Sequence, residues 1–166
     1  METRMPGAAY IVFDGDNDGW AYRYMNGWKA NRNIDLSYQN AHDLDAMTSR
    51  AQNEQYVKSK LRERMKQSEA IVVLVGDKTK NLYKFVRWEL ELALELGLPI
   101  IAANLNKKNG QDDVRCPAII RDKGCVIHIP YTLEAIKFAM ANWPGGFRKL
   151  SSAEINGGWR YYPEFD

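Results

Sequence analysis

The stretch that decides the fold is Ala70-Ile71-Val72-Val73-Leu74-Val75, which is followed at once by Gly76-Asp77. A short, continuous run of β-branched and apolar residues that ends at a turn is typical of a strand covered on both faces of a parallel sheet. A similar run over 9–13 precedes a polar loop over 14–19. Together these two stretches predict the centre of a buried α/β sheet.

Strands and helices are expected to alternate along the rest of the chain. Further strands are predicted over 34–38, 99–103 and 124–129, and helices over 20–28, 53–67, 82–96 and 131–143. This alternation favours a three-layer α/β sandwich around a mainly parallel five-stranded sheet. For five strands we expect the flavodoxin-like order 2-1-3-4-5.

The composition is that of an ordinary soluble domain. The chain has 166 residues, of which 45% are hydrophobic and 27% charged, with a formal net charge of +2. A disordered or collagen-like protein is excluded, because so much apolar surface can offset the ordering entropy by burial. The near balance of 23 Lys+Arg and 21 Asp+Glu gives no sign of binding to nucleic acid or an anionic membrane.

The longest apolar stretches, 70–76 and 98–103, are far shorter than the roughly 20 residues of a membrane-spanning helix. The N-terminus shows no secretory signal, so we expect a cytoplasmic protein. Cys116 and Cys125 lack CxxC spacing and are expected to be reduced thiols. No metal site is predicted.

Two parts of the chain differ in composition. Residues 1–143 are predicted to form the α/β domain, and residues 144–166 form an aromatic-rich extension. Ser151 and Glu154 have the spacing of a capping box. A flexible linker would carry fewer aromatic residues, so we expect the extension to pack on the domain or on a neighbouring subunit.

Ligands of open α/β sheets bind beyond the carboxyl ends of the strands, where the strand order reverses. Here that point lies between the first and third strands, which favours the loops over 14–19 and 76–81. The first loop begins like a calcium loop, but Met25 stands where that site needs a bidentate Glu. Its Asp, Asn and Gly residues are also good turn and N-cap residues, with Asn17 or Asp18 as the expected N-cap of the following helix.

An alternative interpretation is a Mg²⁺-dependent DxD phosphatase. Asp14 would be the nucleophile, Asp16 the acid, and Gly76-Asp77 the later magnesium-binding motif. However, Asp18 stands where a small hydroxylated or β-branched residue is expected. A phosphoacceptor receiver domain fits less well, because no Lys follows the fifth strand.

Glu89 is the most informative residue of the helix predicted over 82–96. On a helical wheel it lies in the middle of the apolar arc, whereas Arg87, Glu91 and Glu95 lie opposite. A carboxylate on a buried stripe reduces stability unless it is paired or opens into a cleft. Glu89 is therefore a candidate catalytic carboxylate, with a purely structural Glu as the alternative.

Two other patterns have simpler interpretations. Trp20, Tyr24 and Trp28 recur at helical spacing, which predicts packing in the core or between helices, with stacking on a nucleotide base as the alternative. The basic residues over 58–66 are expected to form a solvated helix face, because no aromatic residues alternate with them. The absence of G-x-G-x-x-G disfavours a Rossmann dehydrogenase.

The sequence resembles the TIR-like family that includes the sensor enzymes of the bacterial Thoeris antiphage system, over roughly residues 8 to 140. The blocks that carry the resemblance are 10–14 with 16–18, 68–76 with Thr79, and 86–90 with Ala93 and 99–101. The most specific is Val86-Arg87-Trp88-Glu89-Leu90, because it is similar to the stretch of TIR domains that carries the catalytic glutamate.

The resemblance implies cleavage of the nicotinamide–ribose bond of NAD⁺, which is the substrate and not a cofactor. The product would be a cyclic or conjugated ADP-ribose signal that activates a separate effector, with a phage component as the trigger and a homo-oligomer as the working assembly. Glu89 would take the catalytic role. The residues expected to line the pocket are Phe13, Asp14, Asn17, Tyr38, Gly76, Thr79 and Trp88.

The acidic cluster over 14–18 departs from ordinary TIR domains, which usually carry less charge there. The second hypothesis is therefore a non-catalytic TIR-like module that binds a nucleotide or self-associates.

Overall fold

The structure is a computed structural model that describes residues 8–30, 37–39, 54–82 and 85–166. Its centre is a six-stranded sheet in the order β2-β1-β3-β4-β5-β6, with all neighbouring strands parallel. The strands are β1 (Ala8–Val12), β2 (Ser37–Gln39), β3 (Ala70–Val75), β4 (Ile100–Asn104), β5 (Val126–Pro130) and β6 (Arg160–Tyr161). The predicted α/β class and the order 2-1-3-4-5 are confirmed, and β6 adds a short strand that the sequence did not predict.

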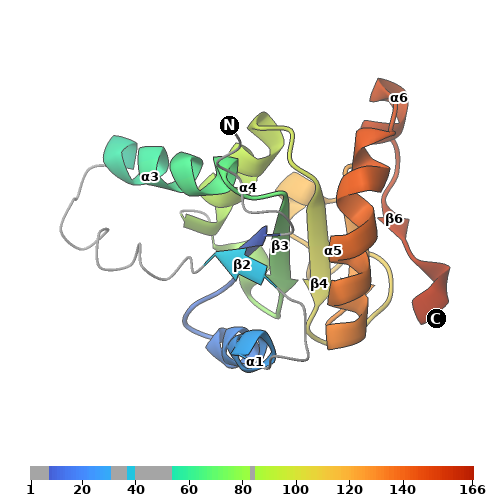
Figure 1. Ribbon diagram of the computed structural model, residues 1–166, viewed down its shortest axis with the longest axis horizontal. Helices are drawn as coiled ribbons and strands as arrows, with labels where there is room; N and C mark the ends of the chain where they lie inside the picture. Colours follow the sequence, from blue (N-terminus) through green and yellow to red (C-terminus); the bar gives the residue numbers. More distant parts are fainter. Residues whose placement is uncertain (1–7, 31–36, 40–53, 83–84) are drawn as a thin grey trace.

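Helices flank both faces of this sheet (Figure 1). They are α1 (Gly19–Ala30), α3 (Glu54–Lys66), α4 (Phe85–Glu95), α5 (Leu133–Arg148) and α6 (Ser152–Ile155). The described residues also form short 3-10 helices: η2 (Thr79–Asn81) and η3 (Ala118–Ile120) lie in connections, and η4 (Pro163–Phe165) follows β6. Of the strand predicted over 34–38, residues 34–36 lie outside the described residues.

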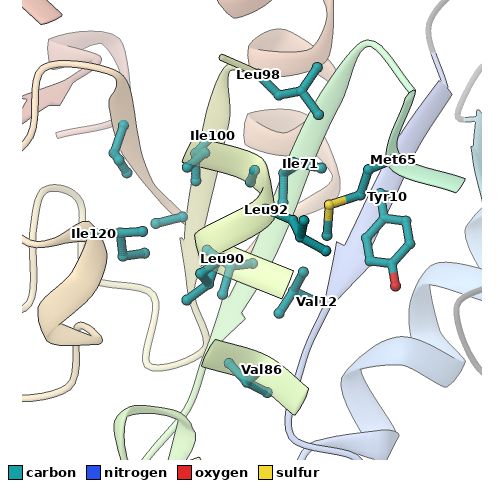
Figure 2. Packing of buried hydrophobic residues seen from close by; sticks show 14 of the residues in the cluster. Tyr10, Val12, Met65, Ile71, Val86, Leu90, Leu92, Leu98, Ile100 and Ile120 are labelled. Carbon is teal, nitrogen blue, oxygen red and sulfur yellow. The ribbon is translucent and has the colours of Figure 1, made fainter. Parts of the chain in front are cut away.

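The uniformly apolar sequence of β3 follows from helices on both sides of it. Ile71 and Val73 pack with residues of α3 and α4, whereas Val72 and Leu74 pack with residues of α1 and α5. Alternate residues of a strand point to opposite faces, so a strand between two helical layers must be apolar throughout. Figure 2 shows the first of these two clusters, with Leu90 of α4 among the strand residues.

Helix α1 is turned differently from the prediction. It buries Ala21, Tyr22 and Met25, whereas Trp20 and Tyr24 are exposed. The prediction that the aromatic stripe packs in the core is therefore wrong for Trp20 and Tyr24. The small side chain of Ala21 lets the helix approach the sheet closely, and Tyr22 then stacks on Phe13 with ring centroids 4.7 Å apart.

The last helix of the domain, α5, runs to Arg148 with Pro144 inside it, so the predicted end at Trp143 is wrong. Trp143 is buried and its ring lies 6.4 Å from that of Phe147, so apolar packing holds the final turn despite the proline.

The segment after α5 packs back on the domain. The capping box of Ser151 and Glu154 is present in α6, and β6 pairs with β5. The ring of Phe138 in α5 then makes edge contacts with Tyr162 at 4.9 Å and Phe165 at 5.4 Å. Tyr162 and Phe165 thus pack against α5, beside which the segment with β6 runs in Figure 1.

Candidate functional site

The loops after β1 and β3 meet at the carboxyl edge of the sheet. Val12 pairs with Val73 and the two strands run in parallel, so residues 14–19 and 76–81 emerge side by side. In the sheet, β2 lies on the far side of β1 and β4 lies on the far side of β3, so the strand order reverses between β1 and β3. This is where an open α/β sheet binds its ligands.

Asp14 is buried and organises the first loop. Its Oδ1 accepts hydrogen bonds from the backbone N–H groups of Asp16 at 3.0 Å and Asn17 at 3.3 Å, and its Oδ2 accepts one from Asn17 Nδ2 at 2.7 Å. Because both carboxylate oxygens are engaged within the loop, the geometry favours a turn-forming role over that of a phosphatase nucleophile.

Asp18 connects the two loops. Its Oδ2 lies 3.5 Å from the hydroxyl of Thr79, and the same hydroxyl accepts a hydrogen bond from the N–H of Gly76 at 2.9 Å. A Cβ atom at position 76 would lie only 2.2 Å from this Oδ2, so the absence of a side chain there makes room for the carboxylate. Burial raises the pKa of Asp18, and the nearby charge of Asp14 raises it further, while the Thr79 hydrogen bond acts in the opposite direction.

A third segment, which the sequence did not predict, completes this edge. The guanidinium of Arg115 lies 2.5 Å from a carboxylate oxygen of Asp77, and it comes from the connection between β4 and β5. A turn built on Asp112 holds it: Oδ1 of Asp112 accepts hydrogen bonds from the N–H groups of Val114 and Arg115, both at 3.0 Å. An Asp two and three residues before these N–H groups is an Asx-turn pattern, and that pattern was the available sequence signal.

These three segments line an open cavity of about 450 Å³ at the carboxyl edge. It is lined by Asn17, Asp18, Trp20, Gly76, Asp77, Lys78, Leu105, Asn106 and Arg115. Of the predicted site residues, Asn17 and Gly76 line this cavity, and Asp14 and Thr79 support its walls through the bonds described above.

Glu89 lies on α4, which packs on the opposite face of the sheet from α1. Only 9% of Glu89 is exposed, and its buried neighbours on the helix include Val86, Leu90 and Ala93. Figure 2 shows Val86 and Leu90 beside Val12, so this part of α4 crosses β1 near its carboxyl end. The predicted arc is confirmed for most of its residues, although Phe85, which belongs to it, is exposed. On the opposite face Arg87 pairs with Glu91. Glu89 is not among the described residues that line the cavity.

Trp88 and Phe13 are not among the described residues that line this cavity. Trp88 lines a groove between α3 and α4, where Lys58 Nζ lies 4.5 Å from its ring centroid. Phe13 is stacked on Tyr22 of α1. The backbone of Tyr38 pairs with that of Ala9, and its side chain lies outside the described part.

The thiols of Cys116 and Cys125 are free, as predicted, and both are buried. Within residues 8–30, 37–39, 54–82 and 85–166, no three His, Cys, Asp or Glu side chains form a group that could hold a metal ion. None of the helices in this part of the chain has the length and apolarity needed to cross a membrane.

The comparison with known protein families gives one match. The family model described as "Thoeris protein ThsB, TIR-like domain" matches residues 10–110, which include part of β1, all of β3, α4 and β4, and both loops of the carboxyl edge. No curated protein matches the chain. The match spans more than half of the 166 residues, and the chain therefore belongs to the family of TIR-like domains of the Thoeris antiphage defence protein ThsB.

Proposed function

We propose that this chain cleaves NAD⁺ at the bond between nicotinamide and ribose, with Glu89 as the catalytic carboxylate. The observation that carries the proposal is a carboxylate with 9% exposure on the sheet-facing side of α4, among apolar neighbours, in a chain of this family. Carboxylates in largely buried positions are frequent among groups that do chemistry.

The chemistry requires charge stabilisation more than a strong nucleophile. As the C–N bond breaks, nicotinamide leaves with the bonding electron pair and positive charge develops on the ribose carbon and ring oxygen. A carboxylate held in a dry, apolar setting stabilises that charge more than one in water does. Water then adds to the ribose carbon and releases a proton, which gives ADP-ribose; a hydroxyl in place of water would give a cyclic or conjugated product.

The helix position supports this role for Glu89. It stands in the second turn of α4, between Val86 and Leu90, which pack in one cluster with Val12 at the carboxyl end of β1. As in the family hypothesis, the product would serve as a signal for a separate effector, and a neighbouring copy of the chain would complete the substrate site.

The proposal is tested by nicotinamide release from NAD⁺, measured with and without lysate of phage-infected bacteria. Glu89→Gln keeps the shape of the side chain but removes the charge, and we expect a loss of about 100-fold or more. The matched control is Glu91→Gln on the exposed face of the same helix, which should stay within about twofold of the wild type.

Circular dichroism would check that both variants fold. Undiminished release by a folded Glu89→Gln variant would contradict the assignment of Glu89. If the wild type releases no nicotinamide under either condition, the non-catalytic binding module is the better hypothesis.

A further inference from the structure

The C-terminal segment contacts the loop that brings Arg115 to the carboxyl edge. Residues 159–166, which we call the strap, follow Gly157 and Gly158 and contain η4 and both residues of β6. They lie outside residues 10–110, the range that the family model matches. We propose that the docked strap positions Arg115 at the candidate site, and that release of the strap loosens this side of the site.

Asn109 makes the polar contact between the strap and the loop after β4. Its Nδ2 donates hydrogen bonds to the carbonyl of Tyr162 at 2.9 Å and to Oδ1 of Asp166 at 2.8 Å. One amide group therefore fixes both the backbone just after β6 and the last residue of the strap.

Trp159 makes the apolar contact to the same loop. A Cβ atom at position 110 would lie 3.2 Å from two carbons of the Trp159 ring, so the ring packs closely on the backbone of Gly110. This glycine has a φ of +108°, a conformation that other residues rarely adopt. The Trp159 ring also lies nearly perpendicular to that of His128 in β5, with centroids 6.0 Å apart. Trp159 thus joins the loop to the sheet.

A series of hydrogen bonds continues from Gly110 to Arg115. Asn104, at the end of β4, donates to the carbonyl of Gly110 at 2.7 Å. Asn106 donates to one carboxylate oxygen of Asp112 at 3.0 Å, and the other oxygen accepts the N–H of Arg115, also at 3.0 Å. The strap therefore holds one end of a turn whose other end carries the guanidinium that lines the cavity.

The strap is a small unit that can detach while the sheet stays folded. β6 pairs over two residues, and Trp159 and Tyr161 remain 39% and 41% exposed. Gly157 and Gly158 precede it, and glycine gives the chain the freedom to pivot. Segments with short hydrogen-bonded elements and much exposed surface open at a lower free energy than the core. Docked and released forms of the strap would thus give Arg115 two levels of restraint.

Hydrogen–deuterium exchange of the full chain, without substrate, tests this inference. Trp159→Ala removes the contact with the loop, and Phe165→Ala removes an anchor on α5 that lies on the strap itself. In both variants the amides of Val114 and Arg115 should exchange about tenfold faster, because a less restrained turn opens more often. The amides of β3 should keep the wild-type rate, which shows that the sheet remains folded. Phe165→Ala is the sharper test, since its effect must travel through the strap.

A third variant and two controls complete the comparison. Asn109→Ala removes both hydrogen bonds to the strap and should also speed the exchange. Its matched control is Asn156→Ala, because Asn156 donates to Ser152 within α6. Tyr56→Ala removes an exposed ring on α3 and is the control for the aromatic variants. Both controls should stay within about twofold of the wild type at Val114 and Arg115.

His128 reports whether the strap is docked. It is fully buried, and burial lowers its pKa to about 4, while the charges of Asp122 and Asp113 act in the opposite direction. Release of Trp159 admits water to the imidazole, so the pKa of His128, followed by NMR, should rise towards 6.5 in Trp159→Ala and Phe165→Ala.

The two measurements together can overturn the inference. A raised pKa of His128 with wild-type exchange at Val114 and Arg115 would show that the strap is released without effect on the turn. Wild-type values of both quantities in Trp159→Ala would show that this contact does not hold the strap. Either result contradicts the proposal.

A further readout rests on the proposed function. Phe165→Ala should raise the KM for NAD⁺ about threefold and leave kcat within about twofold, because Arg115 would bind substrate and Glu89 would do the chemistry. A fall in kcat at unchanged KM would contradict the positioning role. The exchange measurement needs no substrate, so it decides the inference even if the chain does not cleave NAD⁺.

Discussion

Two aspartates at the carboxyl edge, Asp18 and Asp112, are almost equally buried but have opposite pKa shifts. Asp18 is 6% exposed and Asp112 is 8% exposed. The pKa of Asp18 is raised, by burial first and by the charge of Asp14 second. Burial also acts to raise the pKa of Asp112, yet its hydrogen bonds from Arg115, Asn106 and Val114 outweigh that effect and lower it.

The difference shows that burial raises the pKa of a carboxylate here unless enough hydrogen-bond donors outweigh it. Asp112 receives two backbone N–H groups and one side-chain amide, each at 3.0 Å. Asp18 has a long contact of 3.5 Å with the Thr79 hydroxyl and a second carboxylate nearby. Asp112 therefore holds a loop together, whereas Asp18 carries a charge that the fold does not fully compensate.

The largest expected effect is that of Asp112→Ala. Loss of this carboxylate leaves the N–H groups of Val114 and Arg115 without their acceptor, so we expect the free energy of unfolding to fall by about 3 kcal/mol in urea denaturation. The matched control is Asp113→Ala, which removes the exposed neighbour that accepts one hydrogen bond from Gln111. It should have a much smaller effect, and equal losses in the two variants would show that Asp112 does not hold the turn.

An intermediate effect is expected for Gly76→Ala. Its Cβ would lie 2.2 Å from the Asp18 carboxylate, which must then move away from Thr79, at a cost of about 2 kcal/mol. Gly27→Ala in α1, where a Cβ meets nothing within 4 Å, should instead stabilise the protein. In the double variant Gly76→Ala with Asp18→Ala the loss should largely disappear, and simple additivity would contradict this account.

The smallest effect is expected for Asp18→Asn, and it has the opposite sign. A raised pKa means that the folded state binds the proton more tightly, so the contribution of Asp18 to stability decreases as the pH rises from 3.8 through its folded pKa. Asn carries no charge, so at pH 7 the variant should be more stable than the wild type by about 1 kcal/mol or less. This advantage should shrink as the pH falls towards 3.8.

Asp112 should show the reverse pH dependence. Because its pKa is lowered in the folded state, the Asp112 carboxylate stabilises the fold above pH 3.8, and this contribution is lost as the pH falls through the folded pKa. The test measures the free energy of unfolding from pH 3 to pH 7 for Asp18→Asn, Asp112→Asn and the exposed control Asp16→Asn. The first two variants should differ from the wild type with opposite pH dependence. Parallel curves for the first two variants would refute the contrast.

Most of the sheet could be predicted from the sequence because each strand is marked by a pattern within a few consecutive residues. The run over 70–75 is apolar at every position, and the strand found there has the same bounds. The orientation of α1 could not be predicted in this way. Trp20 and Ala21 are both apolar, and only the packing of the helix against the sheet decides which of them is buried. The end of α5 was missed because Pro144 is tolerated where Trp143 and Phe147 pack around it.

The residues of the candidate site could likewise be predicted only in part. Glu89 was located by its position on an apolar arc, and the loops after β1 and β3 by the rules of parallel sheets. Arg115 was missed because it reaches Asp77 from a long irregular connection, whose path depends on the hydrogen bonds of Asp112. Such tertiary contacts leave no periodic pattern in the sequence.

The strands at the two ends of the sheet have a consequence for aggregation. In the described part, β2 pairs over three residues and β6 over two, and they are the shortest strands of the sheet. β6 covers part of the edge of the five-residue strand β5, and the proline of η4 follows it almost at once. Short outer strands leave little free backbone for another chain to join, so the sheet is poorly suited to growth by the addition of strands at its edges.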